Sequence, residues 1–439
     1  MGIGQGNGHV IGSAVAIALL TIQSPCLAIN VYLDYGHDTF FSTNATAKAA
    51  VEAAAADIST AITTPLAAIT SNSYTGTYLS TDVTFDWVYR YDNPTTGSDV
   101  TIDPGITAAD QVTVFVGARN IQSTDTLGVG GPASVGWSIG ASGFPNESSI
   151  AVTDAATQSS AVYSRGDGPV ISKVQSSFDW DSYSQSYSID IGSAYGSLWI
   201  DLDEDNNNVQ DRPTALDSYW HWDHTTEPAS GKNDLYSVAL HEILHALGVG
   251  SADAWNTLSS GSTWNGAEVL AITGSGANLV QGGHIYPNVM STRLSDGMPQ
   301  EVVMDPSLDE GKRKELTGLD LAFLRDIGWD TNTSSTALPG DFNGDNTVDA
   351  GDLNLVLFGW NGSPDGDWVN WIPTTSIGPA QLNDVLFNWG STSLIGASSI
   401  GASSIGAVPE PSGLAMAMTK LATLAFCRRY LKSTHRSCL

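Results

Sequence analysis

The chain has 439 residues, of which 46 are Asp or Glu and 17 are Lys or Arg, so its formal net charge is −29. A chain this acidic is repelled by nucleic acid and by anionic lipid, which argues against both as partners. Its three cysteines, Cys26, Cys427 and Cys438, lie close to the two ends. The body between them therefore uses neither disulfide bonds nor thiolate chemistry.

Residues 1–28 have the pattern of a secretory signal peptide. An apolar stretch from Val10 to Ile22 is followed by Ser24-Pro25-Cys26-Leu27-Ala28, which places small residues at a cleavage site after Ala28. The stretch is too short to span a bilayer. We therefore expect the export machinery to secrete the protein, with a mature chain that begins at Ile29.

Strand and helix patterns predict an α+β domain after the signal peptide. The run 30–35 alternates like a strand, and 45–62 is an alanine-rich helix pattern. Residues 75–200 contain short strand-like runs between Gly, Ser, Asn and Asp turns. Two further helices are predicted, over 234–247 and 312–326.

The helix over 234–247 carries residues typical of a metal site. It contains His241-Glu242-Ile243-Leu244-His245, and residues four apart lie on one helix face, so both imidazoles can bind one ion. Glu242 is placed to accept a proton from the metal's water and pass it to a leaving amine. Gly248 can adopt a positive φ and turn the chain out of the helix.

These residues resemble the motif of the metzincin metallopeptidases, His-Glu-x-x-His-x-x-Gly-x-x-His or Asp, followed by a methionine turn. His241, Glu242, His245 and Gly248 match the motif, whereas Ser251 occupies the position of the third ligand. A neutral hydroxyl is a poor zinc ligand. The third ligand must therefore come from elsewhere, or the site is inactive.

His284 is the predicted third zinc ligand. It follows His245 by 39 residues and precedes Met290 by six. This spacing resembles the leishmanolysin-like branch of the metzincins, in which an insertion precedes the third histidine. The resemblance assigns Met290 to the methionine turn, an apolar floor beneath the ligands. Asp253, two residues past the usual position, and Glu268, in a gluzincin-like position, remain alternatives.

The resemblance implies a metzincin-like domain over residues 29–330, with a mixed twisted sheet, an active-site helix and a C-terminal helix. It also implies hydrolysis of peptide bonds in proteins, with one catalytic Zn²⁺ and Glu242 as general base. We expect the strand 197–202 to be the sheet edge that pairs with an extended peptide substrate. The alternative function is an inactive metzincin-fold surface or matrix protein that uses a calcium module for attachment.

A predicted calcium-binding module covers residues 340–390, after a polar linker over 331–339. Oxygen-bearing residues follow the spacing of an EF-hand-type loop, although the last position is Asp and a glycine stands fourth rather than sixth. The expected Ca²⁺ ligands are Asp341, Asn343, Asp345, Thr347 through its carbonyl, Asp349 and Asp352.

The module resembles a small α-helical dockerin-type repeat. A second copy of the loop, from Asn370, has lost nearly every acidic ligand, so we expect one calcium ion. The resemblance allows a cohesin-type partner, although the degenerate copy removes half of the usual symmetric surface.

The C-terminal residues form two further segments. Residues 391–407 repeat Ser-Ile-Gly-Ala and predict a spacer without a core. Within 408–439, Val408-Pro409-Glu410-Pro411 precedes an apolar stretch and Arg428-Arg429. This arrangement resembles the PEP-CTERM sorting signal, which an exosortase-like membrane enzyme processes. We therefore expect a secreted protein that is extracellular or associated with the cell surface.

Overall fold

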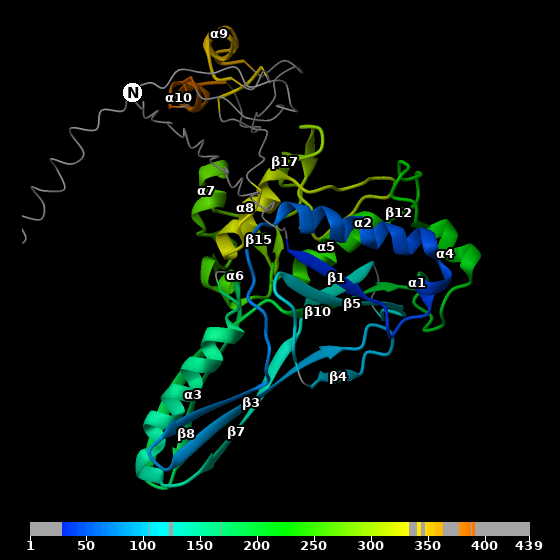
Figure 1. The fold of residues 1–439 in the computed structure, drawn as a ribbon. Helices are drawn as coiled ribbons and strands as arrows, with labels where there is room; N and C mark the ends of the chain where they lie inside the picture. The colour runs from blue at the N-terminus through cyan, green and yellow to red at the C-terminus, as the bar shows by residue number, and fades with distance from the viewer. Residues whose placement is uncertain are drawn as a thin grey trace, which may run out of the picture. The chain divides into compact units, whose positions relative to one another are not determined.

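The computed structural model describes residues 29–103, 105–122, 126–166, 168–332, 340–343, 347–362, 377–387 and 389–390. The predicted signal peptide, spacer and sorting signal lie outside these residues. Helices and several sheets make up the described chain (Figure 1), which confirms the predicted α+β class. Within it, no helix is long and apolar enough to cross a membrane.

The central sheet has the strand order β1-β5-β10-β6. Its strands are β1 (Asn30–Asp34), β5 (Gln111–Arg119), β10 (Tyr195–Asp201) and β6 (Gly128–Pro132). The first three run parallel, and β6 pairs antiparallel with β10. The prediction that 197–202 is the edge is therefore wrong, because β10 lies between two strands and is buried along its whole length. The edge is β6.

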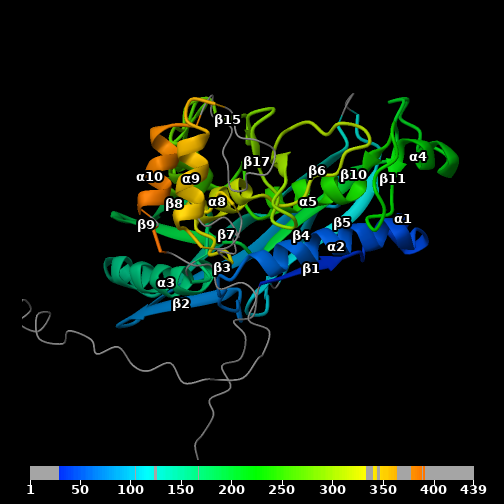
Figure 2. The same cartoon turned by 90° about the horizontal axis from the view of Figure 1, so that it is seen from above.

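Two helices pack on one face of this sheet, α2 (Ala45–Ala61) and α5 (Leu235–Ala246). Their buried apolar side chains share a core with alternate residues of β5, such as Val112 and Val114. Alanines fill the inner face of α2, and their small side chains let that helix approach β1 closely (Figure 2). Helix α5 is therefore packed against both α2 and the central sheet.

The ends of α5 follow from two local interactions. The Asp234 side chain accepts a hydrogen bond from the Ser237 backbone N–H, which caps the start of the helix. The helix ends before Gly248, whose φ of +102° is in the left-handed region. The predicted bounds of this helix, 234–247, are therefore confirmed to within one residue at each end.

The last helix of this part, α8 (Gly318–Ile327), is shorter than the predicted helix over 312–326. Thr317 and Asp320 form a reciprocal capping box, which fixes the start of the helix. Arg313 and Lys314 precede this cap and form ion pairs instead. Capping and tertiary ion pairs thus override the helical pattern of residues 312–317.

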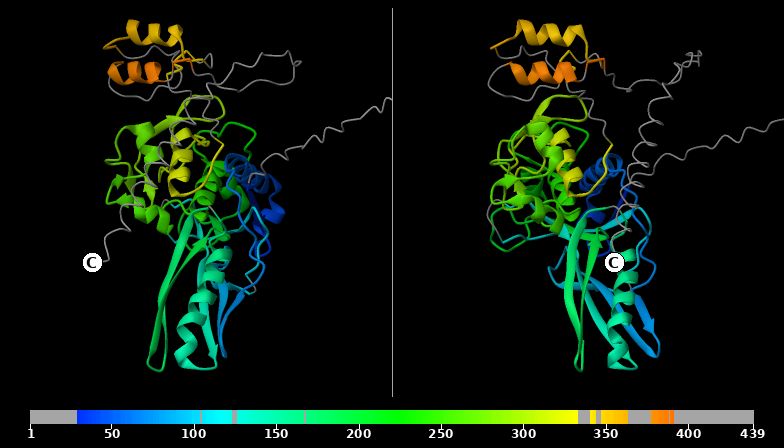
Figure 3. Two further views of the ribbon diagram at one scale, coloured as in Figure 1. Left: turned by 60° about the vertical axis from the view of Figure 1, so that its left-hand side comes forward. Right: turned by 90° about the vertical axis from the view of Figure 1, so that its left-hand side faces the viewer.

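The predicted strand-rich region before α5 forms a second group of elements, which projects away from the central sheet (Figure 3). An antiparallel sheet carries one long helix and one long hairpin, and an aromatic core joins them around Phe85, Trp87 and Tyr163. These elements are β2 (Ser73–Tyr78), β3 (Thr81–Asp92), β4 (Asp99–Ile102), β7 (Ser134–Ser142), α3 (Ser148–Tyr163), β8 (Val170–Trp180) and β9 (Tyr183–Gly192).

The remaining elements of this part of the chain are short, and several of them surround α5. They are α1 (Phe40–Thr43), α4 (Pro213–Tyr219), β11 (Trp220–His221), β12 (Asn233–Asp234), α6 (Asp253–Leu258), β13 (Ser259–Ser260), β14 (Thr263–Trp264), α7 (Ala267–Thr273), β15 (Val280–Gln281), β16 (His284–Ile285), β17 (Met290–Thr292) and β18 (Pro299–Glu301), together with the 3-10 turn η1 (Pro145–Glu147).

Residues 340–390 contain two described helices, α9 (Ala350–Phe358) and α10 (Pro379–Phe387). A small apolar cluster lies between them and the preceding loop. Its buried members are Phe342, Val348, Val356, Ile377 and Val385. So small a core supplies little stability by itself, which is why such modules commonly depend on a bound ion.

The ion pair between Arg313 and Asp234 ties the start of α5 to the segment before α8. Arg313 Nη2 and Nε donate to the two Asp234 carboxylate oxygens at 2.7 and 3.0 Å, and the Asp234 side chain is fully buried. We expect Arg313→Met to lower the free energy of unfolding by about 3–5 kcal/mol, because it leaves a buried charge uncompensated. Urea denaturation measures this loss.

The Arg313→Met/Asp234→Asn double variant provides the control for this prediction. It removes both charges and keeps an oxygen that can cap α5, so we expect it to recover part of the lost stability. Equal stability of the two variants would contradict the assignment of the loss to an unpaired carboxylate.

Candidate metal centre

Three histidines lie together above the central sheet. His241 and His245 come from α5, and His284 comes from β16. His245 Nε2 lies 3.1 Å from His241 Nε2 and 3.2 Å from His284 Nε2. The predicted third ligand therefore meets the other two, although 39 residues separate it from His245.

The outer nitrogens of two of the rings are held by the backbone. His241 Nδ1 lies 2.8 Å from the carbonyl oxygen of Val303, and His245 Nδ1 lies 2.8 Å from that of Val249. A carbonyl only accepts, so the protons of these two rings reside on Nδ1. Their Nε2 atoms consequently turn bare lone pairs toward each other, and His245 Nε2 also faces His284 Nε2.

This arrangement of lone pairs fits a bound cation. The two unprotonated nitrogens of His241 and His245, 3.1 Å apart, repel each other unless a positive charge lies near both. Protein metal sites hold the outer nitrogen of a ligating histidine in the same way, with a carbonyl or carboxylate. The residues present therefore suit a metal ion with nitrogen ligands.

The electrostatic surroundings keep these rings uncharged. Burial lowers the pKa of His245 to about 4 and holds the pKa of His241 well below its ordinary value. Burial also lowers the pKa of His284. Neutral imidazole is the form that binds a metal, so the three rings are ready to bind at neutral pH.

The turn at Gly248 places one of the supporting carbonyls. A Cβ on Gly248 would lie 2.7 Å from Ile171 Cδ1 and 2.9 Å from Ala252 Cβ, and its φ is positive. Only glycine fits this close turn, which brings the Val249 carbonyl back to His245. The predicted role of Gly248 in ending the helix is confirmed.

A buried carboxylate holds the loop that orients His241. The Asp320 carboxylate accepts hydrogen bonds from the backbone N–H of Val303, at 3.1 and 3.2 Å, and from both donors of Thr317. Asp320 is 2% exposed. Sequence reasoning missed this role, although an acidic residue between two leucines in an apolar helix was a signal of it.

The prediction that Met290 forms a floor beneath the ligands is wrong. Met290 lies on β17 with 41% of its surface exposed, so it cannot form a buried floor. Met304 is 1% exposed, and its carbonyl accepts from the N–H of Ile285, next to His284. Met304 therefore occupies the buried position expected of Met290. Both methionines follow a valine in the sequence, which explains the confusion.

The structure distinguishes His284 from the two alternative third ligands, Asp253 and Glu268. Within the described part of the chain, the group of His, Cys, Asp and Glu residues close enough to share an ion is His241, His245 and His284. Asp253 begins α6 outside this group, and Glu268 is paired with Arg325 at 2.8 Å. Neither alternative ligand is therefore brought to the centre.

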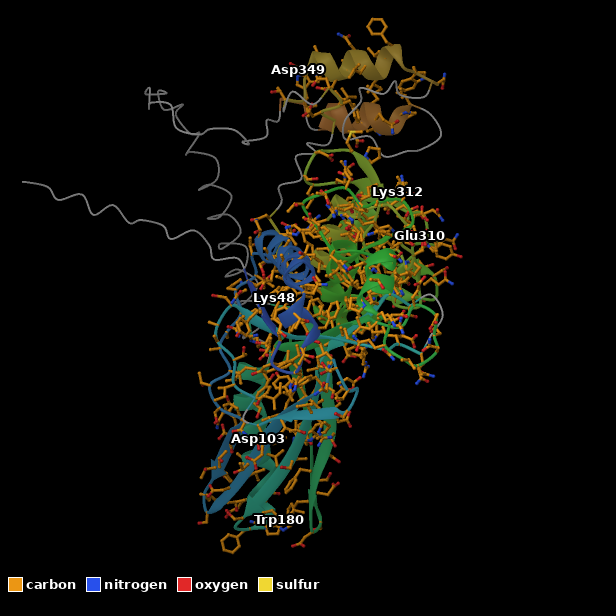
Figure 4. All side chains as sticks on the ribbon, turned by 90° about the vertical axis from the view of Figure 1, so that its right-hand side faces the viewer. Lys48, Asp103, Trp180, Glu310, Lys312 and Asp349 are labelled. Carbon is orange, nitrogen blue, oxygen red and sulfur yellow. The ribbon has the colours of Figure 1, made fainter. Side chains whose placement is uncertain are left out.

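Glu242 lies beside the histidines in the same cavity, which has a volume of about 680 Å³. It is 6% exposed, and burial raises its pKa to about 8, while a hydrogen bond from the Gly130 backbone acts in the opposite direction. Strand β6 and the segment 303–310 both contribute residues to the lining of the cavity, among them Glu310, which is labelled in Figure 4. A carboxylate, three imidazoles and a strand edge thus share one space.

The predicted calcium loop is described in part, because Asp345 lies outside the described residues. Asp341 and Asp352 are buried, at 1% and 0% exposed. The Asp352 carboxylate accepts from the backbone N–H of Phe342 and Asn343, and Asp349 caps α9. Asn343, Thr347 and Asp349 remain predicted ligands, and the Ca²⁺ site stays a prediction.

Metal binding should depend on His284 and not on Asp253. We expect the purified protein to retain one zinc ion per chain after dialysis, counted separately from any Ca²⁺ in residues 340–390. His284→Ala should weaken binding by more than about 100-fold, since it removes one of three ligands, whereas Asp253→Ala should leave it unchanged. Elemental analysis and competition with a chelator measure both. The reverse order of effects would transfer the ligand role to Asp253.

Asp320 should act on the metal through the loop it holds. We expect Asp320→Asn to lower metal affinity about 10- to 100-fold, because an amide cannot accept all the hydrogen bonds that orient the Val303 carbonyl. The matched control is Asp326→Asn on the same helix, since Asp326 accepts from the Glu268 and Val269 N–H groups, away from the histidines. Equal loss of metal affinity in both variants would reduce the effect to general destabilisation.

No protein-family model, no curated protein and no solved structure matches the chain. The resemblance to metzincins therefore rests on the sequence motif of His241, Glu242, His245 and Gly248.

Proposed function

We propose that the chain is a secreted zinc-dependent endopeptidase of the metzincin type. The observation that carries the proposal is the convergence of three histidine Nε2 atoms beside the buried side chain of Glu242. Three neutral imidazoles and one open position are the ligand set of catalytic zinc sites. Structural zinc sites are closed by four protein ligands, and a fourth is lacking among the described His, Cys, Asp and Glu.

The proposed chemistry assigns one role to each group. When bound, a zinc ion would polarise the scissile carbonyl and make a water molecule more acidic. Ionised Glu242 would accept the proton of that water and deliver it to the leaving amine, and a bound cation would favour this ionised form by lowering the raised pKa of the buried carboxyl. His241 and His245 keep their orientation through the carbonyls behind them, so these two ligands are in place before substrate arrives.

Strand β6 supports an extended peptide as the substrate. Within the described chain β6 pairs only with β10, so its outer edge has backbone groups available for another strand. Its glycines let it approach the site helix, since a Cβ on Gly130 would lie 2.3 Å from the Glu242 carbonyl oxygen. A peptide paired with β6 would therefore pass directly beside Glu242.

The remaining predictions complete the proposal. The dockerin-like module would bind one Ca²⁺ to stabilise its small core, and the PEP-CTERM-like signal would direct processing by an exosortase-like enzyme. The natural partners would be protein or peptide substrates and the export machinery. A cohesin-type partner has no supporting contact in the described residues.

Glu242 provides the decisive test between an enzyme and an inactive surface protein. We expect Glu242→Ala to lower the hydrolysis of an unstructured protein such as casein by about 10²–10⁴-fold, because the general base is lost. The zinc content should stay at one ion per chain. The matched control is Glu268→Gln, which removes one carboxylate from an exposed ion pair with Arg325.

Release of labelled peptides from casein measures the activity, and elemental analysis measures the metal. Full activity in the Glu242 variant would remove this residue from the mechanism. A metal-loaded wild-type protein without any peptidase activity would favour the alternative of an inactive surface or matrix protein.

A further inference from the structure

A second cavity, of about 400 Å³, lies on the other side of strand β6 from the histidines. Val129 of β6 lines both cavities, whereas Arg119 and Trp199 line only this one. Trp199 alternates along β10 with Leu198 and Ile200, which belong to the core under the helices. The second cavity therefore opens on the face of the sheet opposite α5.

Arg119 is held in this cavity by stacking. Its guanidinium carbon lies 3.9 Å from the centroid of a Trp199 ring, and Trp199 is 7% exposed. Gly97, with a φ of +73°, leaves room for the guanidinium, because a Cβ there would lie 1.9 Å from Arg119 Nη1. The two neighbours fix the cation in a plane and leave its edge accessible from the cavity.

Arg119 has no ion-pair partner within 4.0 Å among the described residues. By contrast, Arg293, Arg313 and Arg325 are each paired with a carboxylate. Asp92 favours the charged form of Arg119, but from beyond ion-pair distance. An arginine fixed in a cavity without a carboxylate partner, in a chain of net charge −29, is suited to bind an anion from outside.

The position of this cavity relates it to a bound peptide. A peptide that pairs with β6 extends the sheet, so its side chains alternate between the two faces. Side chains on the α5 face enter the histidine cavity, and their neighbours project toward Arg119. Asn120 and Gln122, whose amides also line the cavity, can bind a carboxylate beside the guanidinium.

We propose that Arg119 forms a subsite for an acidic side chain of the substrate, so that the enzyme prefers peptides with Asp or Glu on the face opposite the histidine cavity. The acidic residue then lies an odd number of positions from the residue that fills the histidine cavity. This inference rests on the proposed function for the peptide path along β6. The guanidinium fork binds the carboxylate by two hydrogen bonds, which an uncharged amide side chain reproduces poorly.

Cleavage of a peptide series tests the preference. The series is a cleavable ten-residue peptide with Gln at each varied position and one Glu moved along it. We expect wild-type kcat/KM to rise at least fivefold for Glu at alternate positions only. Arg119→Gln should remove this rise and leave the all-Gln peptide within twofold of wild type. Arg119→Lys should keep part of the rise, since it keeps the charge but loses the fork.

A binding measurement separates this inference from the proposed function. Calorimetry with the Glu242→Gln protein compares the best Glu peptide with its Gln counterpart, without any cleavage. We expect the Glu peptide to bind at least fivefold more tightly, and Arg119→Gln to abolish the difference. If the wild type cleaves no peptide and the Glu peptide still binds more tightly than the Gln peptide, the peptidase proposal is refuted and this subsite remains supported.

Lys173→Gln is the control for net charge, because Lys173 forms an exposed pair with Asp190 on the distant hairpin of β8 and β9. It should leave the preference for Glu unchanged. Circular dichroism verifies the fold of each variant, and Arg119→Lys replaces Arg119→Gln if the latter does not fold. Equal cleavage and equal binding of Glu and Gln peptides by the wild type would overturn the inference, as would a preference unaffected by the Arg119 variants.

Discussion

The site depends on one constraint, which is that three imidazoles must present unprotonated Nε2 atoms to the same point. His241 and His245 are placed to meet this constraint, because each donates its other N–H to a backbone carbonyl, that of Val303 or Val249. These carbonyls belong to two separate turns. The candidate metal centre is consequently only as well ordered as the backbone around it, and much of the nearby sequence serves to fix that backbone.

Buried carboxylates do most of this fixing. Asp320 holds the N–H of Val303 from below, and Asp234 caps α5 while it pairs with Arg313. Between these two anchors, Lys314 is 5% exposed and forms an ion pair with Glu301 at 3.1 Å. A buried charge is stable only when it is paired, so these contacts hold the backbone of the segment 301–320 in place. This segment also lines the histidine cavity, as β6 does.

Two glycines of β6 determine how closely this strand approaches α5. A Cβ on Gly128 would lie 2.8 Å from Val238 Cγ1, and one on Gly130 would meet the backbone of Glu242. The same strand separates the histidine cavity from the cavity of Arg119. In the proposed peptidase, this strand edge between two cavities would give a reason for selectivity along a bound peptide, because histidines line the cavity on one face and a stacked arginine lines the cavity on the other.

Much of the site could be predicted from the sequence because helix geometry is local. The spacing of His241 and His245 and the turn at Gly248 follow from residues a few positions apart, and their structure agrees with the pattern. His284 was identified from family spacing, and its meeting with the other two histidines required the whole intervening loop to fold back. The α+β class followed from periodicity, which depends on neighbouring residues alone.

Other features were decided by tertiary structure. Met290 and Met304 have similar local sequences, and only packing shows that the first is exposed and the second buried. The strand 197–202 was expected to be the sheet edge, whereas the antiparallel strand β6 pairs outside it. Residues 312–317 have a helical pattern, but a cap at Thr317 and two distant ion pairs prevent that helix. The sequence by itself determined the chemistry of the ligands, since spacing on a helix is a local property. The tertiary structure decided which residues surround them, because burial and strand order depend on contacts between residues far apart in the chain.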